Sequence, residues 1–146
     1  MDGTPPRRLA VLTSWQLAQG AARARRLVSA RLDALGGSRA EFAMLATLEE
    51  FGGLSQADLG RRIGLDRSDV TALVTASEEA GLIRRERDGV DRRRMTLTMT
   101  RAGARRLGRL QQAIDEAQAE ILDGFTAADR RQLATLLTRL AAAETH

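Results

Sequence analysis

The chain has 146 residues, of which 43% are hydrophobic and 29% are charged, and its formal net charge is +4. This length fits a single domain, and the composition is too apolar for a chain that is disordered throughout. No apolar run approaches the roughly 20 residues that span a bilayer, and the first residues lack the pattern of a secretory signal. A cytoplasmic protein without membrane contact is therefore expected.

Missing residue types exclude several classes of site. The chain contains no Cys, which excludes disulfides, sulfur-ligated zinc and thiol chemistry. Its only His is His146, the last residue, so a His-based catalytic triad or a His-rich metal site cannot be assembled within one chain. Carboxylates remain, but no motif surrounds a positioned pair of them. We therefore expect neither an enzyme nor a bound cofactor.

All 23 basic residues are Arg. This reflects either coding bias in a GC-rich genome or selection for phosphate binding. Their position is more informative than their identity. Residues 84–106 contain nine Arg and three acidic residues, a net of +6, whereas the rest of the chain has a net of −2. A local basic excess favours a surface that faces a polyanion.

The first part of the chain predicts a loose arm and two helices. Residues 1–6 form the arm, and apolar residues then recur at three- to four-residue spacing over residues 9–35, which predicts one long helix. Gly36-Gly37 ends it. The segment Ser38-Arg39-Ala40-Glu41 has the spacing of a capping box and predicts a second helix, which stops at Gly52-Gly53.

Two shorter helices are expected next. Ser55-Gln56-Ala57-Asp58 opens the third helix in the same way, and Gly64 fits the position just past its end, where a left-handed backbone suits Gly. Asp66 is expected to cap the fourth helix, which Gly81 closes. The face of this helix that we expect to be buried carries Val70, Leu73, Val74 and Ser77.

The periodicity changes after the fourth helix. Leu82-Ile83 begins an extended segment, and Asp88-Gly89 is a hairpin-turn signal. Alternation of Met95, Leu97 and Met99 with Thr predicts a second strand. Two further helices follow, the first capped by Thr100 and the last starting at Thr126. The first and last helices each have an apolar face that needs a partner. These faces are expected to pack on each other within one chain, to pack between two chains, or to do both.

The third and fourth helices have the spacing of a helix-turn-helix, in which the second helix lies in the DNA major groove. The residues that would face the groove are polar or small. Arg bonds guanine edges, Ser and Thr reach bases or phosphates, and a Thr methyl contacts the thymine methyl. These residues are Arg67, Ser68, Asp69, Thr71, Ala72 and Thr75.

The hairpin that follows carries six Arg, at positions 84, 85, 87, 92, 93 and 94. A two-stranded loop beside a recognition helix is a wing, whose Arg side chains can enter the adjacent minor groove. Asp91 would repel phosphate if free, but it can hold the guanidinium of Arg93 in a bidentate pair. The simpler alternatives are a solvated loop and, for Asp91, a turn former.

Residues 54–107 resemble the MarR family of winged helix-turn-helix transcriptional regulators. The likeness rests on Leu54-Ser55-Gln56, Leu65-Asp66-Arg67-Ser68-x-x-Thr71, Glu79-Ala80-Gly81-Leu82-Ile83-Arg84-Arg85, Leu97-x-Met99-Thr100, Ala102-Gly103 and, above all, the wing motif Asp91-x-Arg93. Family members usually have Leu where this chain has Met99. The resemblance implies a mainly α fold with a small two-stranded β-wing.

The resemblance also implies an organisation and a set of contacts. Residues 1–146 would form a single domain, with a DNA-binding unit at 38–100 and dimerisation helices at 8–36 and 101–143. A homodimer would bind a palindromic site on double-stranded DNA, with Asp91 supporting the wing. The residues expected at the DNA are Ser55, Gln56, Arg67, Ser68, Thr71, Ala72, Thr75, Arg92, Arg93 and Arg94.

Most members of this family are repressors that release DNA when a small phenolic or anionic effector binds. Trp15 could line such an effector site, and Arg23, Arg25 or Arg26 could meet a carboxylate. The simpler interpretations are a core or dimer anchor for Trp15 and a solvated face for the arginines. The alternative function is a winged-helix protein–protein module that binds no DNA, which the basic wing disfavours because an acidic partner would be needed.

Overall fold

The computed structural model describes residues 3–142. Residues 1–2 of the predicted arm, residue 143 of the predicted dimerisation helices and His146 lie outside the described residues. The elements, in chain order, are α1 (Arg7–Ala10), α2 (Thr13–Asp33), α3 (Arg39–Phe51), α4 (Gln56–Ile63), α5 (Arg67–Glu79), β1 (Ile83–Arg87), β2 (Met95–Met99), α6 (Arg101–Ile121) and α7 (Ala127–Ala142). They form two compact units, one of residues 28–115 and the other of the segments on either side.

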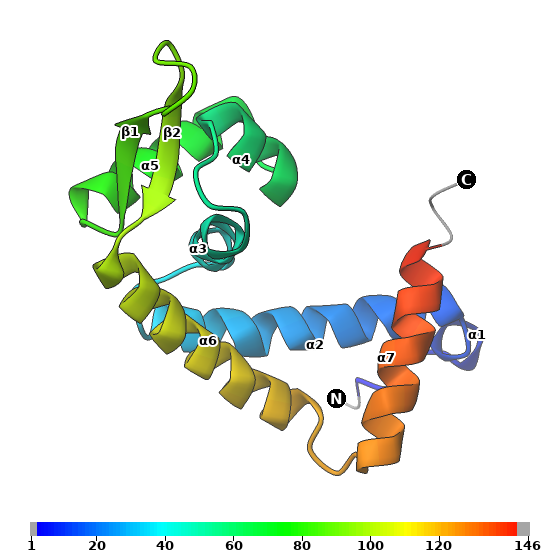
Figure 1. Cartoon of the computed structure of the whole chain (residues 1–146). Coiled ribbons are helices and arrows are strands. Elements are labelled where there is room, and N and C mark those ends of the chain that lie inside the picture. The colour runs from blue at the N-terminus through cyan, green and yellow to red at the C-terminus, as the bar shows by residue number, and fades with distance from the viewer. Residues whose placement is uncertain (1–2, 143–146) are drawn as a thin grey trace. The chain divides into compact units, whose positions relative to one another are not determined.

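The unit of residues 28–115 contains α3, α4, α5, the hairpin and most of α6, and Figure 1 shows the hairpin beside α5. Its core collects one apolar face from each element, so that a single cluster holds these elements together. The side chains of Leu45, Leu59, Val74, Leu97 and Leu110 are almost fully buried in it. β1 and β2 pair antiparallel, with Arg85 opposite Leu97.

The helix caps confirm the predicted starts of the helices. Ser38, Ser55 and Asp66 each accept a hydrogen bond from the backbone N–H three residues further on, at 3.1, 3.1 and 2.9 Å. Each bond satisfies one of the amide groups that the first turn of a helix leaves without a partner. Gly64 has a φ of 71°, which confirms the left-handed position predicted after α4.

The structure differs from the sequence prediction at three places. The long first helix is broken between Ala10 and Thr13, where the side-chain amide of Gln16 donates to the Ala10 carbonyl (3.1 Å) and Val11 is exposed. Leu54 makes an unpredicted two-bond bridge to Leu97, at 3.2 and 2.7 Å. The hairpin loop is also longer than a two-residue turn and spans residues 88–94.

The other unit combines the first part of α2, the last turns of α6, and α7. The guanidinium of Arg23 donates to the carbonyls of Ile121 (3.1 Å) and Glu120 (3.4 Å), where the end of α6 leaves carbonyl groups without helical partners. A largely apolar cavity of about 580 Å³ lies among these helices, lined in part by Leu17, Phe125 and Leu137. No helix within residues 3–142 has the length and apolarity that crossing a membrane requires.

Candidate nucleic-acid interface

The corner between α4 and α5 has the close packing of a helix-turn-helix. A Cβ atom on Gly60 would lie 2.9 Å from Cγ2 of Val70, so this approach requires glycine. The Leu65 amide donates to the Gly60 carbonyl (3.1 Å), and Asp66 then caps α5. The turn therefore fixes how α5 leaves α4. Sequence reasoning missed the role of Gly60, although a small residue on the inner face of a helix is the signal for such contact.

The burial of α5 confirms the predicted division of its faces. Val70 and Val74 are buried, with exposures of 2% and 0%, and Leu73 is half-buried. The residues of α5 predicted to face the groove are all exposed and are polar or small: Arg67, Ser68, Asp69, Thr71, Ala72 and Thr75. Apart from Arg67 these side chains are short, so a groove could approach the helix closely.

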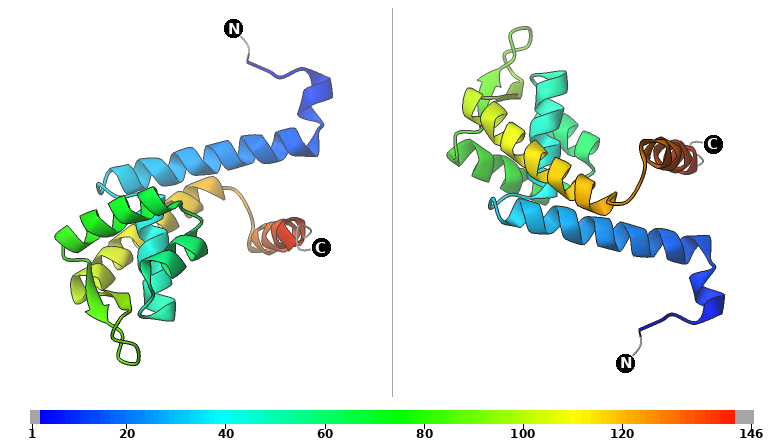
Figure 2. Two further views of the ribbon diagram at one scale, coloured as in Figure 1. Left: turned by 90° about the horizontal axis from the view of Figure 1, so that it is seen from above. Right: turned by 90° about the horizontal axis from the view of Figure 1, so that it is seen from below.

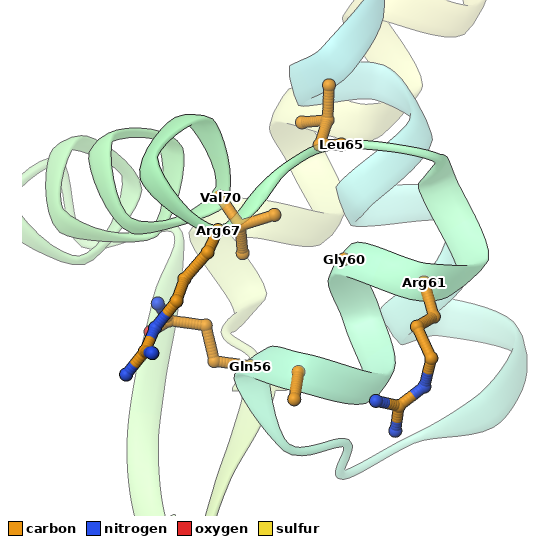
Figure 3. Close-up of a pocket in the computed structure, with 7 residues that line it drawn as sticks. Gln56, Gly60, Arg61, Leu65, Arg67 and Val70 are labelled. Carbon is orange, nitrogen blue, oxygen red and sulfur yellow. The ribbon is translucent and has the colours of Figure 1, made fainter.

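A notch of about 510 Å³ lies between α4 and α5 and is lined by Gln56, Gly60, Arg61, Leu65, Arg67 and Val70 among others. Figure 3 shows Gln56 and Arg67 on one side of it and Arg61 on the other. Gly60 and Val70 form its floor, where the two helices touch. Arg67 and Arg61 place guanidinium groups on the two sides of the notch, and that of Arg61 is paired with the carboxylate of Asp58.

Ser55 and Gln56 lie at the start of α4, as predicted, but their side chains have partners within the chain. The Ser55 hydroxyl caps α4 and donates to Asp58 (2.8 Å). Gln56 donates to the Thr71 hydroxyl (2.8 Å) and accepts from Arg85 (3.3 Å). Gln56 therefore connects α4 to α5 and to β1, whereas its sequence position predicted only a DNA contact.

The wing loop extends away from the helices of its unit, as both views of Figure 2 show. Asp91 accepts a hydrogen bond from the backbone N–H of Arg93 (3.0 Å), and its backbone carbonyl accepts from Arg94 (3.0 Å). No ion pair joins Asp91 and Arg93 in the described part of the chain, so the predicted bidentate pair is wrong. Asp91 shapes the loop through the backbone because a two-residue separation favours a local Asx turn.

The arginines of the basic segment divide into paired and unpaired groups. Arg84 pairs with Glu86, Arg85 with Glu78 and Arg106 with Glu41, and Arg87 donates to the backbone carbonyl of Arg92. Arg92 and Arg93 are exposed, and within residues 3–142 their guanidinium groups contact no partner. Arg101 and Arg105 of α6 are exposed as well. The net charge of residues 84–106 thus overstates the charge available to a polyanion, and Arg92 and Arg93 are the exposed, unpaired arginines that lie on the wing.

Arg94 differs from its neighbours because its guanidinium forms an ion pair with Asp58 of α4. Arg61 forms a second ion pair with the same carboxylate. The Ser55 hydroxyl and the Arg61 guanidinium hold the pKa of Asp58 below its ordinary value of 3.8, and Arg94 adds to the effect. The base of the wing is therefore linked to α4 by a carboxylate that stays ionised at neutral pH.

This link predicts a pH-dependent loss of stability in Asp58→Asn. Because the pKa of Asp58 is lowered on folding, its carboxylate stabilises the folded chain above about pH 3.8, and the effect is lost as the pH falls through the folded pKa. The thermal midpoint of the variant, measured by circular dichroism, should lie below that of the wild type at pH 7, and the difference should disappear towards pH 2. Asp123→Asn, which removes the same charge from the other unit, is the control. If the difference in thermal midpoint between the wild type and Asp58→Asn does not change with pH, the ionised carboxylate of Asp58 is not the source of the stability.

Trp15 is half-buried on α2 and does not line the apolar cavity of its unit. Arg23 was a predicted contact for an effector carboxylate, but its guanidinium donates hydrogen bonds to the carbonyls of Ile121 and Glu120 at the end of α6. The structure brings the residues that were predicted to contact DNA together around α5 and the wing. The residues predicted for an effector are not gathered into a comparable site.

Comparisons with known proteins agree with this geometry. The model of the MarR family matches residues 35–94. A relative from Thauera aromatica, named for transcriptional regulation of the hcr operon, is 36% identical over 99 residues, and the match covers 68% of this chain and 60% of that protein. The chain thus spans about three fifths of this curated relative.

Solved structures match over nearly the whole chain. A transcriptional regulator from Pseudomonas aeruginosa is 28% identical, with a TM-score of 0.76, and the match covers 91% of this chain and 99% of that one. The PcaV transcriptional regulator from Streptomyces coelicolor, solved in complex with its natural ligand, is also 28% identical, with a TM-score of 0.73 and coverage of 96% and 99%. These relatives are transcriptional regulators and not enzymes. By sequence motif and by fold, this chain belongs to the MarR family.

Proposed function

We propose that the chain is a transcriptional regulator that binds double-stranded DNA, with α5 in the major groove and the wing in the adjacent minor groove. One observation carries the proposal: Arg92 and Arg93, two exposed arginines whose guanidinium groups have no partner within residues 3–142, lie on a wing beside the polar face of α5. Narrow minor grooves concentrate negative potential and attract such side chains. Asp91 supports them by fixing the loop, and Arg94 fixes its base. Binding to operator DNA would place the protein in the cytoplasm.

The DNA-binding form is proposed to be a homodimer, built on residues 8–36 and 101–143. The support is an exposed apolar surface on α7, where Leu136, Leu137 and Leu140 are 46–50% exposed. Apolar residues clustered in this way mark an interaction surface. A two-fold pair of chains would read a palindromic operator, with its recognition helices in successive major grooves about 34–36 Å apart.

Regulation is proposed to be repression that a small phenolic or anionic effector relieves. The support is the likeness to PcaV, whose structure holds its natural ligand. An effector shifts a regulator only if it binds one spacing of the recognition helices more tightly than the other. Trp15 stays the candidate contact for this effector, and the proposal includes no cofactor.

Binding to duplexes that the purified chain selects from random sequence tests the proposal. Two chains bring four copies of the wing arginines Arg92 and Arg93, so the logarithm of the affinity should fall linearly with the logarithm of salt concentration, with a slope of about −4 or steeper. Fluorescence anisotropy with a labelled duplex measures this slope. The alternative, a protein–protein module, predicts that no duplex is selected even at low salt and that the wing binds an acidic protein instead.

A further inference from the structure

Four side chains connect α4, α5 and β1 through hydrogen bonds that all run in one direction. Arg85 of β1 donates from Nε to Glu78 (2.9 Å) and from Nη2 to Oε1 of Gln56 (3.3 Å). Gln56 donates from Nε2 to Oγ1 of Thr71 (2.8 Å), and Thr71 donates to the backbone carbonyl of Arg67 (2.8 Å). Figure 3 shows the side chain of Gln56 directed from α4 toward the start of α5.

The chemistry of Arg85 fixes this direction. A guanidinium group only donates hydrogen bonds, so the amide oxygen of Gln56 must face Arg85. The amide nitrogen of Gln56 therefore faces Thr71, and the Thr71 oxygen must accept. The single hydroxyl proton of Thr71 is then used in the bond to the Arg67 carbonyl. Reversing any one bond would set two donors or two acceptors against each other.

This arrangement leaves the Thr71 hydroxyl without a proton to offer to DNA. Guanine O6, thymine O4 and the purine N7 atoms all require a donor. Both bonds also hold Oγ1 in place, and because Oγ1 and Cγ2 share the Cβ atom, the methyl group has one fixed direction as well. Thr71 is nonetheless exposed on the polar face of α5. Its methyl group can therefore contact a thymine methyl, and the second lone pair of Oγ1 can only accept, from adenine N6 or cytosine N4.

We infer that Thr71 is a specificity-determining residue that reads a thymine through contact between the two methyl groups, and that Gln56 and Arg85 position it for this contact. The inference rests on the proposed function, because it requires α5 to enter the major groove. Thr75 provides a contrast on the same face. Its hydroxyl has no partner among the described residues and keeps its proton for a base or phosphate.

A matched pair of variants separates the methyl from the hydroxyl. Thr71→Ser keeps the hydroxyl and its two hydrogen bonds but removes the methyl, whereas Thr71→Val keeps the methyl and removes the hydroxyl. Each thymine of the selected duplex is replaced in turn by deoxyuridine, which lacks only the 5-methyl group. Affinities are measured by anisotropy at one salt concentration, and circular dichroism checks that both variants keep the wild-type helix content.

The wild type should lose affinity by about fourfold for each half-site when the contacted thymine is replaced, the value of one buried methyl group. Thr71→Val should keep this loss, because the χ1 rotamer that valine prefers in a helix still directs a methyl group to the same side without the two hydrogen bonds. Thr71→Ser should bind the thymine and uracil duplexes equally. The inference is overturned if no thymine is sensitive in the wild type, if Thr71→Ser keeps the sensitivity, or if Thr71→Val loses it. Failure of the wild type to select any duplex would instead refute the proposed function on which the inference rests.

Discussion

Arg93→Ala is expected to weaken binding to the selected duplex by at least about 30-fold. A base or groove contact by one arginine contributes about 1–3 kcal/mol, and a dimer loses two of them. The folded state should not change, because within residues 3–142 the guanidinium of Arg93 contacts no other group and only its backbone N–H is bonded, to Asp91. Anisotropy gives the affinity, and thermal denaturation gives the stability.

The control for this prediction is Arg109→Ala, which removes the same charge from the exposed surface of α6. A general electrostatic effect would weaken binding equally in both variants, since both lower the net charge by one. A specific role of the wing predicts a large loss for Arg93 and a small one for Arg109. Unchanged affinity in Arg93→Ala would remove the wing from the mechanism.

Gly103→Ala is expected to lower the free energy of unfolding by about 3 kcal/mol, because it overpacks the junction where α6 begins. A Cβ atom on Gly103 would lie 2.1 Å from the backbone oxygen of Leu82 and 2.7 Å from Cγ of Met99. The Thr100 hydroxyl fixes the same junction, since it accepts from the Gly103 amide (3.1 Å) and donates to the Gly81 carbonyl (2.6 Å). The backbone cannot yield without moving the hairpin.

Gly108 on the same helix provides the matched control. A Cβ atom on Gly108 would meet nothing within 4 Å, so Gly108→Ala should stabilise the chain by about 0.5–1 kcal/mol through the better helix propensity of alanine. Urea denaturation followed by circular dichroism measures both variants. If Gly103→Ala and Gly108→Ala have equal free energies of unfolding, the contacts of Gly103 with Leu82 and Met99 are not tight enough to exclude a Cβ atom, and the prediction is wrong.

Features that depend on a few neighbouring residues were predictable from the sequence. The cap of α5 by Asp66 and the left-handed Gly64 follow from groups at most four residues apart, and the structure confirms both. The alternation of Met95, Leu97 and Met99 likewise predicted β2. Such signals are local, so their energetics do not depend on how the rest of the chain folds.

The partners of the site residues were not predictable, because they come from distant positions. Gln56 and Thr71 are 15 residues apart, Arg94 and Asp58 are 36 apart, and Arg106 and Glu41 are 65 apart. No spacing rule connects such pairs before the fold is known. The sequence could therefore show where arginines gather but not which of them neighbouring acids neutralise, and it gave Asp91 a side-chain partner where the structure has a backbone one.

The long-range partners give the arginines of the wing different roles. Arg94 is committed to Asp58 and holds the base of the loop against α4, while Arg92 and Arg93 remain available beyond it. On α5, Thr71 is held by Gln56, and Ser68 donates to Asp66 (2.9 Å). A surface whose side chains are held before binding loses less conformational entropy when it meets its target.

Hydroxyl-radical footprinting of the complex between the purified chain and its selected duplex tests the central proposal most directly. The account predicts two protected patches related by a dyad, with their centres about one helical turn apart, and protection of the flanking minor grooves that disappears in Arg93→Ala. A single unpaired patch, or a bound duplex whose minor grooves stay unprotected, would contradict it.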